Sequence, residues 1–196
     1  MRRTLILTAA ILCAGAFTFA GDDAEKGWTP LFDGKTLDGW RRLDGKPLVG
    51  WEVVDGMLRR KGGGRDIYTE KEYSNFVLEL EWKIARRGNS GVKYRMRYYG
   101  GSYLGPEFQV MGDADAEIKG KQLKYATGAM YDLIPVDVSK RRVLPAGQWN
   151  RLRIVANGAK IEHWLNGEKV VDVDVSSEMF QKAIANSKFK KHLDYA

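Results

Sequence analysis

The segment that most constrains the fold is NRLRIVANGAKIEHWLNGEKVVDVDV, residues 150–175. Asn157-Gly158 and Asn166-Gly167 are two-residue turns that tolerate positive φ, and they separate three runs in which apolar and polar residues alternate. Alternation with a period of two places the apolar side chains on one face of a strand. The segment therefore predicts three antiparallel strands joined by tight hairpins.

The rest of the chain repeats this pattern. FVLELEWKI (76–84) alternates cleanly, and further strands are expected at 51–60, 91–99, 106–112 and 128–136. Only SSEMFQKAIANSKF (176–189) resembles a helix, with Ser177 as its cap. Many short strands with regular turn signals predict one all-β domain, a sandwich of two antiparallel sheets with a short helix near the C-terminus.

The first twenty residues have the features of a secretory signal peptide. Arg2 and Arg3 precede the apolar run LILTAAILCAGAFTFA, and cleavage is expected near Ala20. We therefore expect a signal peptide at 1–20, a folded domain at 21–196 and a secreted or periplasmic location. No later run approaches the ~20 apolar residues of a membrane span. The one cysteine, Cys13, lies inside the signal, so no disulfide is expected in the processed domain.

The formal net charge of +7 comes from basic residues that are scattered along the chain, so we expect no nucleic-acid partner. The sequence has no phosphate-binding glycine loop, His-Glu-x-x-His or Gly-x-Ser-x-Gly. Carboxylates are the more promising reagents. In LGPEFQVMG (104–112), alternation places Glu107 and Gln109 on one strand face, which is either a solvated surface or the floor of a site.

Other candidate residues have two readings each. His163 alternates with Ile161 and Leu165, so it is either a buried sheet histidine or a base or ligand. Asn89 begins Asn-Ser-Gly, which is either a simple turn or the lip of a cleft. Tyr131 and Asp132 follow on an expected strand near Glu107.

Seven short motifs in order make the chain resemble the 3-keto-disaccharide hydrolase family. They are GWTPLFDGKTLDGW (27–40), WEVVDG (51–56), NSG (89–91) with Arg95, GPEFQ (105–109) with Asp113, TGAMYD (127–132), WN (149–150) and EHWLNG (162–167). The resemblance covers nearly all of the chain after the signal. It implies a concanavalin-A-like jelly roll in which the face of Glu107 and Gln109 holds carbohydrate.

The activity implied by the resemblance is hydrolysis of glycosides already oxidised at carbon 3, with functional coupling to a sugar 3-dehydrogenase that makes them. A 3-keto group acidifies the hydrogen on C2, so a base can remove it, the C1 oxygen leaves by β-elimination, and water adds back. Glu107 and His163 would be base and acid in either order. Arg95, Gln109, Asp132, Asn89 and Tyr131 would bind the sugar.

Three alternatives stay open. A divalent metal, held by Glu107, Asp132 and His163, could polarise the ketone. A non-catalytic carbohydrate-binding module would share the fold, whereas an ordinary glycosidase of this fold would need paired carboxylates on one strand.

Family members also continue past the helix with a Gly-x-Ile-x-Leu-Gln-Asp-His-Gly turn and a final strand. On this resemblance we expect the sequence to lack the family's last strands, either because the gene product is truncated or because the sequence is a fragment. A truncated product would be inactive if those strands complete the site.

Overall fold

The computed structural model describes residues 4–8, 11–13, 27–112, 118–192 and 194–195. Ala20 and Asp113 lie outside this part of the chain. The strands are β1 (Thr4–Thr8), β2 (Ile11–Cys13), β3 (Trp40–Arg41), β4 (Trp51–Val54), β5 (Met57–Arg60), β6 (Ile67–Thr69), β7 (Phe76–Lys83), β8 (Asn89–Tyr99), β9 (Ser102–Leu104), β10 (Glu107–Met111), β11 (Asn150–Asn157), β12 (Lys160–Leu165) and β13 (Glu168–Asp174). A 3-10 helix spans Gly120–Tyr125, and α1 spans Glu178–Ala185.

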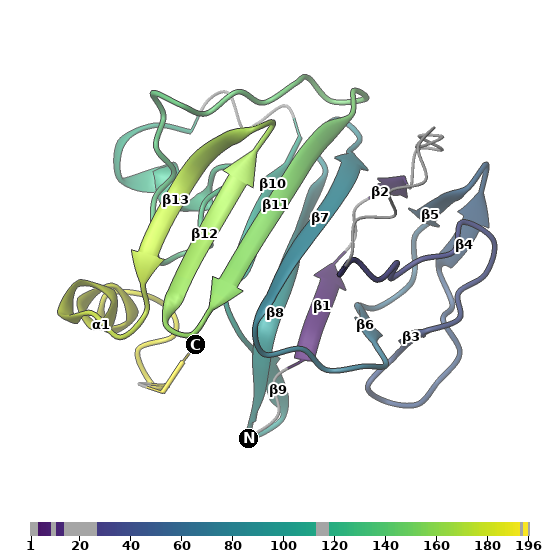
Figure 1. The fold of residues 1–196 in the computed structure, drawn as a ribbon, viewed down its shortest axis with the longest axis horizontal. Coiled ribbons are helices and arrows are strands. Elements are labelled where there is room, and N and C mark those ends of the chain that lie inside the picture. Colours follow the sequence, from purple (N-terminus) through teal and green to yellow (C-terminus); the bar gives the residue numbers. More distant parts are fainter. Residues whose placement is uncertain (1–3, 9–10, 14–26, 113–117, 193, 196) are drawn as a thin grey trace.

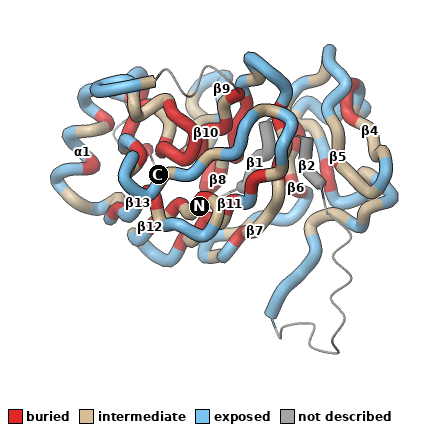
Figure 2. Tube along the Cα trace, turned by 90° about the horizontal axis from the view of Figure 1, so that it is seen from above, coloured by how far each residue is buried: buried red, intermediate tan, exposed pale blue. Residues whose placement is uncertain are grey.

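The strands form two antiparallel sheets that pack face to face. One has six strands, ordered β10-β8-β1-β6-β3 with β9 paired to β8, and the other has seven, ordered β13-β12-β11-β7-β2-β5-β4. In Figure 1 the seven-stranded sheet lies in front, with β8 and β10 behind it. Buried residues gather between the layers (Figure 2). This arrangement confirms the predicted all-β sandwich with one α-helix near the C-terminus.

The two Asn-Gly hairpins form as predicted. β11 pairs with β12 and β12 with β13, and both turns place glycines at positive φ, +53° at Gly158 and +90° at Gly167. Asn166 also has a positive φ of +49°, which is the turn geometry that matches the twist of two joined strands. The alternation of β7 places Leu78 and Trp82 in the core.

One expected strand is absent. Residues 128–136 form turns, with isolated bridges from Met130 to Phe108 and Ile134. The reason is a chain reversal at Asp132, whose φ is +61°, and both Leu133 and Ile134 donate backbone hydrogen bonds to the Met130 carbonyl. The predicted helix forms over a shorter range, and the Ser177 hydroxyl accepts a hydrogen bond from the Phe180 N–H at its start.

The strands β1 and β2 lie inside the stretch expected to be a signal peptide. β1 pairs with β8 on one side and β6 on the other, and β2 pairs with β7 and β5. Figure 1 shows them between the larger block of β7, β11, β12 and β13 and the smaller block of β3 to β6. Each is therefore an interior strand, and each sheet is continuous because of it.

Candidate active site

The strand pair β8 and β10 sets the floor of the site. Lys93 is the cross-strand partner of Glu107, and Gly91 is the partner of Gln109. Directly opposed residues project from the same face of a sheet. Phe108 alternates with these residues and is fully buried between the sheets, so Glu107 and Gln109 lie on the outer face of the six-stranded sheet.

Gly91 makes room for the carboxylate. A Cβ atom at this position would come within 2.2 Å of Glu107 Oε1, far inside van der Waals contact. The side chain of Glu107 therefore lies flat over bare backbone. Only glycine allows this, since any larger residue would displace the carboxylate from the sheet.

Two lysines and the burial of the site control the charge of Glu107. Burial raises the pKa of Glu107, against the attraction of Lys93 and Lys188, which oppose the rise. Burial also lowers the pKa of Lys188, although Glu107 and Asp132 favour its charged form. A raised pKa at the carboxyl group and a lowered pKa at the ammonium group bring the two proton affinities closer together, which favours proton transfer at this place.

Neither lysine was identified as a candidate from the sequence. Lys93 becomes recognisable only once the register of β8 against β10 is known, because its own strand gives no sign of a partner. Lys188 lies after α1, and it reaches the site because its backbone N–H donates a 2.8 Å hydrogen bond to Asp132 Oδ2. No sequence pattern indicates that contact.

Three other predicted residues lie along the same strand pair or beside it. Gln109 Nε2 donates a 3.2 Å hydrogen bond to Asn89 Oδ1. The Tyr131 N–H donates to the Glu107 carbonyl at 2.9 Å, and the Lys188 ammonium lies 4.1 Å from the centre of the Tyr131 ring. Burial and the nearby Glu107 charge raise the pKa of Tyr131. The structure therefore places Tyr131 beside Glu107, and places Gln109 with its partner Asn89 farther along the same strand pair.

Asp132 holds the edge of the site in place. Its carboxylate accepts hydrogen bonds from the Tyr125 hydroxyl at 2.7 Å and the Lys188 N–H, and forms an ion pair of 2.5 Å with Lys124. Burial would raise its pKa, but these donors outweigh burial and the pKa is lowered. With its oxygens occupied, Asp132 positions the Lys188 backbone.

His163 lies on the other side of the six-stranded sheet from Glu107. It is fully buried between the sheets, 4.9 Å from the Phe108 ring measured between centroids. Its Nδ1 lies 2.9 Å from the Gly128 carbonyl, which can only accept, so Nδ1 carries the proton and Nε2 accepts from the Tyr94 hydroxyl at 2.8 Å. Burial lowers the pKa of His163 to about 4. Glu107 and His163 are thus not brought together as an acid–base pair.

Arg95 is also directed away from Glu107. Its φ of +48° breaks the alternation of β8. The guanidinium donates to the Ser74 carbonyl at 2.8 Å, the Gly158 carbonyl at 2.6 Å and Asn75 Oδ1 at 3.0 Å. Arg95 therefore joins β8 to the β11–β12 turn in the other sheet.

The suggested metal ligands do not converge. Among the residues that the structure describes, no group of three or more His, Cys, Asp or Glu side chains is arranged to hold a metal ion. Both ring nitrogens of His163 are engaged in the core, and the oxygens of Asp132 already accept from several donors. The set Glu107, Asp132 and His163 does not fit a metal.

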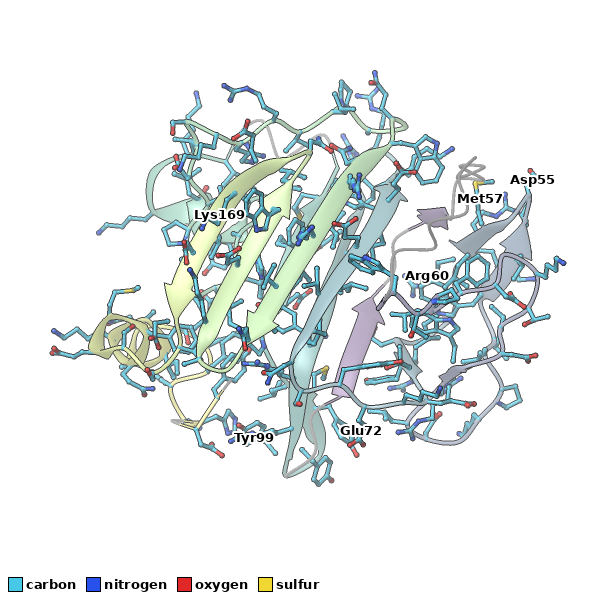
Figure 3. The ribbon with its side chains drawn as sticks, in the orientation of Figure 1. Asp55, Met57, Arg60, Glu72, Tyr99 and Lys169 are labelled. Carbon is cyan, nitrogen blue, oxygen red and sulfur yellow. The ribbon has the colours of Figure 1, made fainter. Side chains whose placement is uncertain are left out.

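A depression of about 650 Å3 lies on the outer face of the seven-stranded sheet, and its lining includes Glu79, Arg153 and Trp164. Glu79, the one carboxylate among the described residues of this lining, pairs with Arg153 at 2.8 Å. Beside the depression, Lys169, labelled on this face in Figure 3, pairs with Glu162 at 3.1 Å. The Glu79 carboxylate is thus held in an ion pair, whereas Glu107 combines burial with a raised pKa, so the Glu107 face is the candidate site.

The fold and the site define a two-sheet antiparallel sandwich with a carboxyl group of raised pKa, Glu107, on one outer face. Residues 27–193 match the model of the 3-keto-alpha-glucoside-1,2-lyase-like domain. The chain belongs to this family, which confirms the resemblance seen in its motifs.

One known protein and two crystal structures are similar over most of the chain. A 3-keto-disaccharide hydrolase from Bacteroides thetaiotaomicron is 29% identical over 194 residues, covering 86% of this chain and 66% of that protein, a little under two thirds of its length. A crystal structure of a provisionally assigned glycosyl hydrolase from Parabacteroides distasonis superposes with a TM-score of 0.75 at 31% identity, covering 86% of this chain and 81% of that one. A second such structure from the same species gives a TM-score of 0.60 at 30% identity.

The described part of the chain contains no helix with the length and apolar character needed to cross a membrane.

Proposed function

We propose that the chain hydrolyses 3-keto-glycosides, including 3-keto-disaccharides, by β-elimination and hydration. The observation that carries the proposal is Glu107, a carboxyl group with a raised pKa that faces two lysines over bare backbone at Gly91. Family membership and the similarity to a 3-keto-disaccharide hydrolase support the same chemistry.

In the first step, Glu107 removes the proton from C2, and the electron pair of the C2–H bond passes into an enolate at the ketone oxygen. Lys93 provides a positive charge to stabilise that oxygen. Its position is fixed by an ion pair in which Lys93 Nζ lies 3.4 Å from Asp66 Oδ2. The enolate then collapses, a C1–C2 double bond forms, and the bond from C1 to the glycosidic oxygen breaks.

Lys188 is the group we assign to the leaving oxygen. Its lowered pKa makes the ammonium a better acid than an ordinary lysine, so it can protonate the departing alkoxide. Water then adds to C1 of the unsaturated ketone and gives up a proton to the neutral Lys188 amine, and Glu107 returns its proton to C2. This assignment replaces His163, whose ring is enclosed in the core.

Export and supply of substrate belong to the same proposal. The features of residues 1–20 favour cleavage near Ala20 and an extracytoplasmic location. The substrate must come from an oxidoreductase that converts the 3-hydroxyl group of a glycoside to a ketone, because the elimination depends on that ketone. A sugar 3-dehydrogenase is such a partner.

The test is release of p-nitrophenol from p-nitrophenyl 3-keto-glucoside, with the unoxidised glucoside as the control substrate. Glu107→Gln should reduce kcat by about 10²- to 10⁴-fold, the usual contribution of a general base. Glu79→Gln, on the outer face of the other sheet, is the matched control and should retain full activity. Full activity of Glu107→Gln would remove the assignment. Sugar binding without turnover by the unaltered protein would identify a carbohydrate-binding module instead.

A further inference from the structure

A second pocket opens on the same outer face as Glu107. It has a volume of about 430 Å3, and its lining includes Arg42, Asp44, Arg65, Asp66, Tyr68 and Tyr103. We call it the tyrosine pocket. The Tyr68 and Tyr103 rings meet edge to face with centroids 6.4 Å apart, and Tyr103 is 40% exposed.

Strand register places this pocket in line with the catalytic carboxylate. Glu107 opposes Lys93, both Lys93 and Tyr68 oppose position 6 of β1, and these residues therefore form one row across the sheet. Strands lie about 4.8 Å apart, so Tyr68 is about 10 Å from Lys93 along the row. Asp66, in the pocket lining, reaches Lys93 directly at 3.4 Å. The pocket therefore adjoins Lys93 through Asp66.

The chemistry of the lining fits a neutral, polyhydroxylated ligand. The pocket contains two arginines and two aspartates, so their formal charges cancel and an anion gains no net attraction. Within the described part of the chain, the Arg65 guanidinium makes no hydrogen bond or ion pair, and the buried Arg42 Nε has no acceptor. Free N–H donors, carboxylate acceptors and exposed ring faces are the groups that bind sugar hydroxyls and the apolar face of a sugar ring.

We infer that the tyrosine pocket binds the leaving-group sugar of a disaccharide whose oxidised sugar lies at Glu107 and Lys93. This inference rests on the proposed function and adds the place where the leaving-group sugar binds and the residues that hold it. Two strand spacings separate Lys93 from Tyr68, which is a length comparable with a disaccharide. The scissile bond would lie between Lys93 and the pocket.

The first test compares two substrates. Tyr103→Ala should lower kcat/KM about tenfold for a 3-keto glucose disaccharide, which is the change that a loss of ~1.4 kcal/mol of ring contact gives. For methyl 3-keto-glucoside, whose leaving group does not reach the pocket, kcat/KM should fall by less than about twofold. The matched control is Tyr98→Ala. Tyr98 is 62% exposed and its ring centroid lies 5.1 Å from that of Tyr103, but it is not in the pocket lining. Equal losses on both substrates, or no loss on either, would overturn the inference.

The second test does not depend on turnover. Unoxidised glucose disaccharide is titrated into the protein, and backbone amide NMR shifts are followed at residues 65–68 and 103. Saturable shifts there, with a Kd that Tyr103→Ala or Arg65→Gln raises about tenfold, support the pocket even if no keto-glycoside is cleaved. Absent shifts, or shifts confined to the other sheet, refute the pocket whatever the activity of Glu107.

Discussion

Lowering the pH from 7 to 4 is expected to destabilise the protein by about 3 kcal/mol through His163 alone. Above pH 6.5 the imidazole is neutral in both the folded and the unfolded chain, so it has no effect on the pH dependence. Below pH 6.5 the unfolded chain binds a proton that the buried ring excludes until about pH 4. Stability is therefore lost through this window and levels off below it. Each pKa unit is worth about 1.4 kcal/mol, which gives the magnitude.

The cause is the enclosure of the ring. Protonation would place a charge beside the Phe108 ring and convert Nε2 from an acceptor into a donor, which breaks its hydrogen bond from the Tyr94 hydroxyl unless that hydroxyl rotates. Among the described residues, no carboxylate contacts either ring nitrogen to offset the charge. Burial of an uncompensated cation is what lowers the pKa.

The assay is urea unfolding at pH 7.0, 5.5 and 4.0, followed by circular dichroism. At pH 7, His163→Asn should be less stable than the unaltered chain. Between pH 7 and 4, however, its free energy of unfolding should fall by about 3 kcal/mol less than that of the unaltered chain, because the asparagine side chain cannot titrate. His192→Asn, which changes the other histidine in the chain, should follow the unaltered protein. If His163→Asn loses stability as steeply as the unaltered chain, the neutral, buried imidazole is wrong.

Two further predictions concern the site and the sheets. Gly91→Ala should reduce kcat about 100-fold, because the new Cβ would displace the Glu107 carboxylate by about 1 Å. Gly88→Ala is the control: its Cβ would crowd Ile84, so the protein should become less stable without a specific loss of kcat. Equal kcat in both variants would contradict this. Removal of residues 1–20 should leave a cooperative thermal transition, because the proposed cleavage near Ala20 removes the same residues from the exported protein. Loss of the transition would show that β1 and β2 belong to the working fold and that residues 1–20 are retained.

The sequence predicts those parts of the fold that depend on local patterns. Asn166-Gly167 specifies a hairpin because both residues accept positive φ, and alternation alone places Glu107 and Gln109 on one face. It also indicates the burial of His163, which shares a face with Ile161 and Leu165. These inferences need only neighbouring residues.

Contacts between distant segments could not be predicted in the same way. Alternation does not show which face of a sheet points at a site, so the buried His163 was paired with a carboxylate on the far side of the opposing sheet. Positive φ breaks the strand patterns around Arg95 and Asp132. It is atypical of arginine, and although aspartate adopts it more often than most residues, nothing near Asp132 in the sequence marks it as the point of reversal. Lys188 reaches Glu107 only through the fold of the segment after α1.

The central position of β1 and β2 sets up a competition between folding and export. A leader must be presented to the export machinery as an extended, accessible segment, yet in the folded chain the same residues hydrogen-bond to four other strands. Withdrawing them would open both sheets and leave unpaired edges that attract other chains. If residues 1–20 are the leader, the machinery must engage them before the sandwich closes. Any mutation that speeds folding in the cytoplasm should then reduce the exported fraction.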